Sequence, residues 1–114
     1  MEKIVLYLLC RDYPMWTIDE EQGLRMPGLP AYLAMPEGLE PLLNELQAAY
    51  DTLFTMQGEA MGFDGIPSEE FRTHLLDLSV QAERLLKANY PTLEIENRIP
   101  ALLLSCPLAP RKAD

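Results

Sequence analysis

The chain has 114 residues, of which 48% are hydrophobic. This is enough to build one core with little left for a second, so we expect a single domain spanning residues 1–114. Eighteen Asp and Glu against nine Lys and Arg give a formal net charge of -9. Such a charge disfavours binding to nucleic acid or to an anionic membrane surface through a basic patch, and it favours a basic partner.

The first predicted element is a strand near residues 3–10. Ile4 to Leu9 is a continuous apolar run, rich in β-formers and too short for a free-standing helix, which predicts a strand buried on both faces at the centre of a small sheet. As a signal peptide the run is at the short limit, and Leu9 stands where a small residue should precede a cleavage site or a lipidated Cys10. No apolar run reaches the roughly eighteen residues that a membrane span requires. We therefore expect an unprocessed, cytoplasmic protein.

Residues 12–38 are predicted to form a long irregular connection, because Pro14, Pro27, Pro30 and Pro36 together with Gly23 and Gly28 deny it any long regular element. Long connections in compact domains are often functional. This one contains the only tryptophan, Trp16, together with Asp12, Asp19, Glu20 and Glu21.

The clearest helix is predicted over about residues 39–57, where apolar residues recur at spacings of three and four. Pro41 fits in its first turn. The opposite face carries Glu40 and Asp51, and no Lys or Arg occurs between Arg25 and Arg72. The middle of the chain is therefore a negative block, which indicates either a solubilising surface or a binding surface.

A second helix is predicted over about residues 68–89, with Ser68 as its N-cap and two acidic residues in its first turn. Gly62 to Gly65 is read as a turn between the helices, which should then pack as an antiparallel hairpin. Leu76 and Val80 lie outside the apolar stripe of this helix. They are expected either under the C-terminal tail or at a partner interface.

Leu93-Glu94-Ile95-Glu96 alternates apolar and acidic side chains, which predicts a strand near residues 92–97 that pairs with the first one. The expected fold is therefore α+β, a small sheet packed against a helix hairpin. Within residues 98–114, the apolar segment Ala101 to Cys106 is interpreted as either an edge strand or an extended arm against the helices.

No catalytic or metal-binding constellation is apparent in the sequence. His74 is the only histidine, and without a positioned nucleophile it is interpreted as a partly buried structural residue. Cys10 and Cys106 lack the spacing of a zinc site and are interpreted as buried free thiols. We expect no enzyme activity, no metal and no cofactor.

Three short segments resemble a loose class of small acidic bacterial proteins. They are Tyr13-Pro14-Met15-Trp16, the helical stretch from Leu46 to Phe54, and Gly62-Phe63 leading to Ser68-Glu69-Glu70-Phe71. Many members of that class are encoded beside polymorphic toxins and are regarded as their immunity proteins. The resemblance covers about residues 1–97, and it implies a protein that binds and neutralises a cognate, basic protein toxin by occluding its active site.

On that reading, an acidic surface with Trp16 as an aromatic anchor would bind the toxin. Its expected residues are Asp12, Trp16, Asp19, Glu20, Glu21, Glu40 and Asp51. Trp16 could equally be a core residue that covers the sheet. The alternative function is a non-catalytic adaptor or regulatory module for another cytosolic protein, which would bind through Leu76 and Val80 or through a sheet edge.

Overall fold

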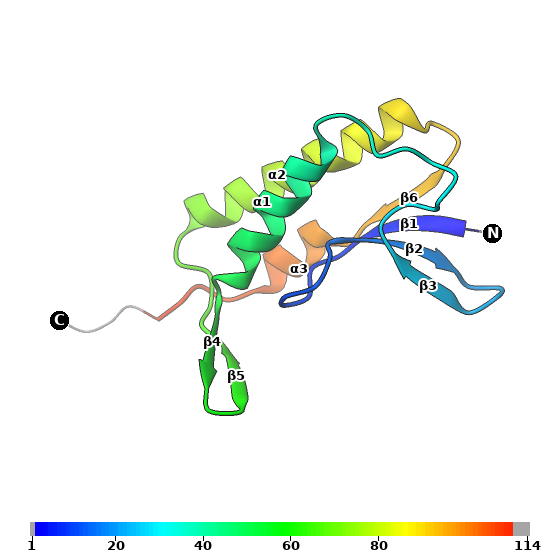
Figure 1. The fold of residues 1–114 in the computed structure, drawn as a ribbon. Coiled ribbons are helices and arrows are strands. Elements are labelled where there is room, and N and C mark those ends of the chain that lie inside the picture. The colour runs from blue at the N-terminus through cyan, green and yellow to red at the C-terminus, as the bar shows by residue number, and fades with distance from the viewer. Residues whose placement is uncertain (1, 111–114) are drawn as a thin grey trace.

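A computed structural model describes residues 2–110 and shows an α+β fold built on a four-stranded sheet (Figure 1). The strands are β1 (Glu2–Leu6), β2 (Met15–Asp19), β3 (Leu24–Pro27) and β6 (Glu94–Asn97), in the spatial order β3-β2-β1-β6. β1 pairs antiparallel with β2 and parallel with β6. The predicted central position of the first strand and its pairing with residues 92–97 are confirmed, although β1 ends at Leu6 rather than near residue 10.

The expectation of an irregular connection over residues 12–38 is wrong for its first half, where β2 and β3 form an antiparallel hairpin. Pro14 precedes β2, and Pro27 ends β3 at the edge of the sheet. Proline is tolerated at strand ends and on edge strands because no central ladder bond is lost there. The prolines therefore bound the hairpin instead of disrupting it, and only the segment after β3 is irregular.

Helix α1 (Leu39–Asp51) buries Leu39, Leu43, Leu46 and Tyr50. It ends six residues before the predicted boundary at residue 57, and the Thr52 hydroxyl donates a hydrogen bond to the Ala49 carbonyl at this end. The chain then forms a second hairpin, with β4 (Phe54–Gln57) antiparallel to β5 (Ala60–Phe63).

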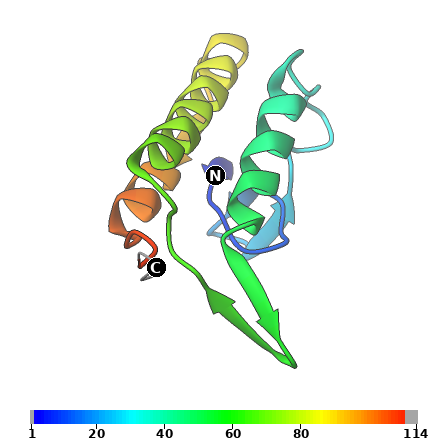
Figure 2. The same cartoon turned by 90° about the vertical axis from the view of Figure 1, so that its left-hand side faces the viewer.

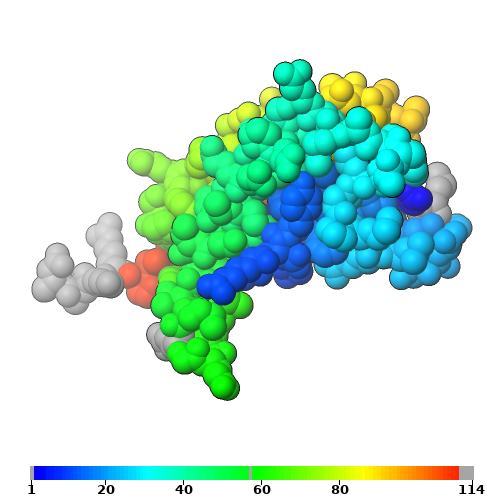
Figure 3. All heavy atoms as spheres, in the orientation of Figure 1, coloured from blue at the N-terminus to red at the C-terminus, as the bar shows by residue number. Residues whose placement is uncertain are grey.

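This β4–β5 hairpin stands out from the body of the molecule (Figures 1, 2 and 3). Gly58 adopts a φ of 65° at its tip, a conformation that suits glycine in a tight turn. The rings of Tyr50, Phe54 and Phe63 stack edge to face in series, 5.3 and 5.2 Å between centroids, and join the hairpin to α1. Gly62 and Phe63 therefore belong to a strand, which corrects the prediction of a simple turn between helices.

Helix α2 (Glu69–Asn89) begins as predicted, since the Ser68 hydroxyl accepts a hydrogen bond from the Phe71 N–H. α2 runs antiparallel beside α1 (Figures 1 and 2). The two helices and the sheet enclose one cluster of buried side chains, to which β1 and β2 contribute Ile4, Leu6 and Met15. Leu76 and Val80 are half-buried, and Leu76 packs against this core.

The apolar segment near the C-terminus forms helix α3 (Ile99–Ser105), which packs on α2, so the prediction of an edge strand or arm for residues 101–106 is wrong. Ile99 and Leu103, four residues apart, are fully buried, while Leu104 is 64% exposed. This is helical periodicity, and Pro100 is accepted in the first turn. Beyond α3 the chain is extended, and Leu108 forms an isolated β-bridge with Ile66. The charged end of the expected arm, residues 111–114, lies outside the described residues.

Candidate functional site

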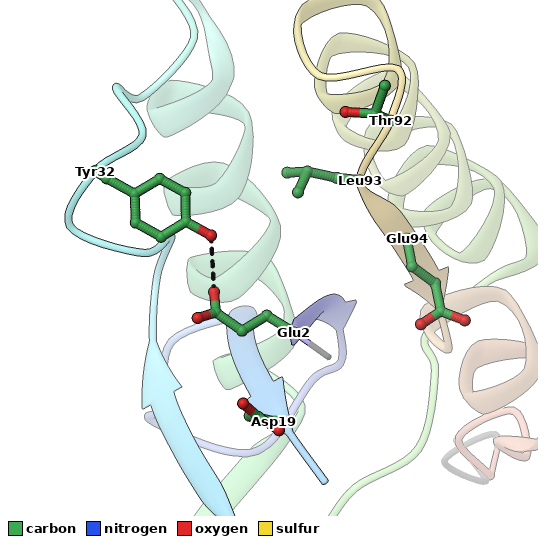
Figure 4. Close-up of a pocket in the computed structure, with 6 residues that line it drawn as sticks. All are labelled: Glu2, Asp19, Tyr32, Thr92, Leu93 and Glu94. Atoms are coloured by element: carbon green, nitrogen blue, oxygen red, sulfur yellow. Dashed lines mark hydrogen bonds between the residues drawn. The ribbon is translucent and has the colours of Figure 1, made fainter. Parts of the chain in front are cut away.

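An acidic cleft opens at one end of the sheet, with a volume of about 730 Å³ (Figure 4). Its lining residues are Glu2, Asp19, Tyr32, Thr92, Leu93 and Glu94. The sheet register brings them together, because Glu2 at the start of β1 pairs with Asp19 at the end of β2, and the next residue, Lys3, pairs with Glu94 at the start of β6. Acidic residues from the ends of three strands therefore line the hollow, with Glu2 and Asp19 on the face that carries Ile4 and Leu6, and Glu94, which pairs with Lys3, on the opposite face.

Asp19 is fixed at the back of this cleft. It is only 8% exposed, and its Oδ1 accepts hydrogen bonds from the backbone N–H groups of Glu21 at 3.1 Å and Gln22 at 3.3 Å. These bonds close the turn between β2 and β3, as Asp side chains commonly do in turns. The carboxylate therefore has a defined position before any ligand arrives.

Glu2 and Tyr32 lie on one side of the cleft, across from Thr92, Leu93 and Glu94 (Figure 4). The Tyr32 hydroxyl donates a hydrogen bond to Glu2 Oε2 at 3.0 Å. This bond, together with partial desolvation, raises the pKa of the Tyr32 hydroxyl above its ordinary value. The phenol thus stays protonated as a donor to Glu2. Neither Glu2 nor Glu94 forms an ion pair with another residue in the range 2–110.

Trp16 lies on the other face of the sheet from the helices, since its neighbours Met15 and Thr17 are the buried residues of β2. Its Nε1 donates to the Tyr13 carbonyl at 2.8 Å. The Arg25 guanidinium lies 4.4 Å from the centroid of the indole ring. The immediate neighbour of the indole is therefore a cation, and the structure does not arrange the four predicted acids as a ring around it.

Those four acids have separate roles in the structure. Asp19 lines the acidic cleft, Glu21 is exposed in the β2–β3 turn, and Glu20 pairs with Lys3 at 2.9 Å. That pairing lowers the pKa of Glu20 and raises the pKa of Lys3. Asp12 accepts a hydrogen bond from the backbone N–H of Tyr13 and so holds the loop before β2.

The two predicted residues on α1 lie at opposite ends of that helix. Asp51 Oδ1 accepts from the Arg11 N–H at 2.7 Å and from Gln47 Nε2 at 2.8 Å, so it anchors the loop after β1. Glu40 is exposed in the first turn, close enough to Tyr13 to add to the rise in that phenol's pKa, which burial mainly causes. Neither residue lines the acidic cleft.

Of the six cleft residues only Asp19 was among the predicted site residues, and the polar or acidic Glu2, Tyr32 and Glu94 were missed. Glu94 carries a visible signal, because it belongs to the alternating segment that predicts β6. Its position beside Glu2 follows only from the parallel register of β1 and β6, which the alternation of a single strand does not specify. Tyr32 belongs to the irregular segment after β3 and has no periodic signal.

The histidine and the cysteines lie away from the cleft. His74 is more exposed than predicted, with 56% of its side chain accessible, and its Nε2 lies 3.0 Å from Glu45 of α1. Cys10 and Cys106 are half-buried free thiols, and burial raises the pKa of Cys106. Within residues 2–110, no group of three His, Cys, Asp or Glu side chains has an arrangement that could hold a metal ion.

No helix in the described part of the chain combines the length and the apolar character needed to cross a membrane. Comparisons of this chain with known protein families, with curated protein sequences and with solved structures gave no match.

Proposed function

We propose that this protein is a cytoplasmic, non-catalytic immunity protein that binds a basic protein toxin and neutralises it by occluding the toxin's active site. The observation that carries the proposal is the acidic cleft, a hollow large enough for a lysine or arginine side chain that is lined by Glu2, Asp19 and Glu94. The resemblance of three sequence segments to toxin-associated immunity proteins points the same way.

The physical basis is electrostatic complementarity. A partner cation that enters the cleft meets the carboxylates of Glu2 and Asp19, of which the buried Asp19 is the less screened by solvent. Hydrogen bonds to charged groups contribute about 1.5–3 kcal/mol each. The wider field of a chain with net charge -9 would accelerate encounter with a basic partner and fix its orientation.

The exposed carboxylates of α1 extend this negative surface. Glu40 and Glu45 are exposed on that helix, and no Lys or Arg lies between Arg25 and Arg72. A toxin active site that binds phosphate or nucleic acid is typically lined by Lys and Arg, so a negative surface of this kind can compete for it. The alternative adaptor function gains no support from Leu76 and Val80, because both are half-buried.

The test is co-purification of the tagged protein with the products of neighbouring genes, at low and at high salt, followed by titration calorimetry and a growth-rescue assay. We expect a one-to-one complex that salt weakens. The double variant Glu2→Gln/Glu94→Gln should bind at least about tenfold more weakly.

The matched control is Glu59→Gln/Glu70→Gln, which removes the same charge at the hairpin tip and at the start of α2. It should retain most of the affinity. Absence of any complex would refute the proposed function, whereas equal losses in both double variants would refute the role of the cleft and leave only a general charge effect.

A further inference from the structure

The face of the sheet that is turned away from the helices contains a second hollow, with a volume of about 370 Å³. Strand alternation directs Ile4 and Leu6 into the core, so Val5 points to this opposite face. No helix covers Val5, yet it is only 1% exposed and lies outside the core cluster. Val5 is flanked in the sheet by Trp16 on β2 and Glu96 on β6, and with Trp16 and Ile18 it lines the hollow.

This apolar hollow has a small excess of positive charge, because Glu96 pairs with Arg98 while Arg25 has no ion pair within residues 2–110, although the whole chain has a net charge of -9. Arg25 and Arg98 both line it. Arg25 contacts the Trp16 ring and forms no ion pair with another residue in the described range. Arg98 interacts with Glu96 through Nε alone, so its two terminal nitrogens remain available as donors.

The position of the hollow limits what can occupy it. It lies over β1 and β2, which are the two inner strands of the sheet, and their backbone groups already pair with neighbours on both sides. A peptide therefore cannot bind there by adding a strand, and side-chain chemistry must provide recognition. The volume is near the lower end of the range for small-molecule sites.

We propose that this hollow binds a small carboxylate carried on a single aromatic ring. The ring would pack on Ile18 and the indole of Trp16, which are both half-buried, and the carboxylate would accept hydrogen bonds from the guanidinium groups of Arg25 and Arg98. Planar guanidinium groups present paired N–H donors that match the two oxygens of a carboxylate. The site is separate from the acidic cleft, so it does not depend on the proposed immunity function.

Trp16 supplies the readout, because it is the only tryptophan in the chain. The purified full-length protein is titrated with phenylacetate while Trp16 emission is followed, with excitation at the red edge of the indole band where phenylacetate does not absorb. We expect a saturable change with a Kd of about 1 mM or tighter. Phenylacetamide, which has the same shape without the charge, and acetate, which lacks the ring, should bind at least about tenfold more weakly.

The variants Arg25→Gln and Arg98→Gln should each weaken phenylacetate binding at least about tenfold. Arg84→Gln, an exposed arginine on α2, is the matched control and should bind normally. Because loss of Arg25 alters the surroundings of Trp16 directly, backbone amide shifts of Val5 and Ile18 provide a second measure of binding, and circular dichroism verifies folding. The proposal would be overturned if phenylacetate gave no saturable change, or if phenylacetamide bound as tightly as phenylacetate. It would also be overturned if Arg84→Gln weakened binding as much as the other two variants.

Discussion

Leu103→Ala tests the packing of α3, the helix that the sequence did not predict. Leu103 is fully buried in the core cluster, and truncation to alanine removes three carbon atoms. At about 0.8 kcal/mol for each buried methylene, the lost transfer free energy is about 2.4 kcal/mol. The cavity left behind adds to this, and leucine truncations in cores cost about 2–5 kcal/mol in total. We expect the free energy of unfolding to fall by about 3 kcal/mol.

The neighbouring residue provides the control. Leu104 is 64% exposed, so Leu104→Ala should change stability by less than about 0.5 kcal/mol. Urea denaturation followed by circular dichroism measures both variants, and a loss of 3 kcal/mol corresponds to a fall in Tm of roughly 10–20 °C for a domain of this size. Similar losses in the two variants would refute the helical packing of α3, because a fully buried and a largely exposed leucine cannot be equivalent.

Three further predictions concern Tyr50, the α2 cap and the C-terminal bridge. Burial raises the pKa of Tyr50 to about 12, whereas a phenol in the unfolded chain ionises near pH 10. The free energy of unfolding should therefore fall between about pH 10 and pH 12, and urea titrations should show a smaller fall in Tyr50→Phe. Ser68→Ala removes the acceptor of the Phe71 N–H and should lower the free energy of unfolding by about 1 kcal/mol in the same titration. Gly65 has a φ of 90° and an added Cβ would lie 2.8 Å from the Ala109 backbone, so Gly65→Ala should destabilise the protein by more than about 1 kcal/mol, and hydrogen exchange at Ala109 should accelerate.

The parts of the fold that the sequence predicted well are those with a strong local pattern. The run from Ile4 to Leu6 has no polar interruption and is rich in β-formers, which favours a buried strand, and β1 is an inner strand in which all three residues are buried. The stripe of α2 repeats at helical spacing for more than four turns, and its buried residues include Leu75, Leu78 and Ala82. The α2 stripe fits the helical period of about 3.6 residues and does not fit the two-residue period of a strand.

The two hairpins and α3 were missed because their signals are short or ambiguous. Phe54 falls on the continuation of the α1 stripe, so periodicity alone extends the helix through it, whereas the chain gains more by pairing Phe54 with Phe63 across a hairpin. The α3 segment is a short apolar run, and such runs do not distinguish strand from helix. Contacts with distant residues decided both structures, as they commonly override local preference.

The candidate site was harder to predict than the fold because its residues meet only through register. Glu2, Asp19 and Glu94 belong to the ends of three strands, and they come to the same end of the sheet once β1 pairs antiparallel with β2 and parallel with β6. A one-residue shift in either pairing would move the carboxylates to other neighbours. Acidic residues are abundant in this chain, so composition identifies a negative surface without identifying which members of it converge.

Net charge also conceals local charge in this protein. A value of -9 describes the field far from the surface, but at physiological ionic strength charges more than about 8 Å apart are largely screened from one another. The open face of the sheet can therefore hold Lys3, Arg25 and Arg98 together with their partners Glu20 and Glu96, and keep a small excess of positive charge. An argument from composition excludes a large basic surface and leaves room for a small cationic hollow. The same chain can accordingly present an acidic cleft to a basic protein at one end of its sheet and two guanidinium groups to a small anion on the open face.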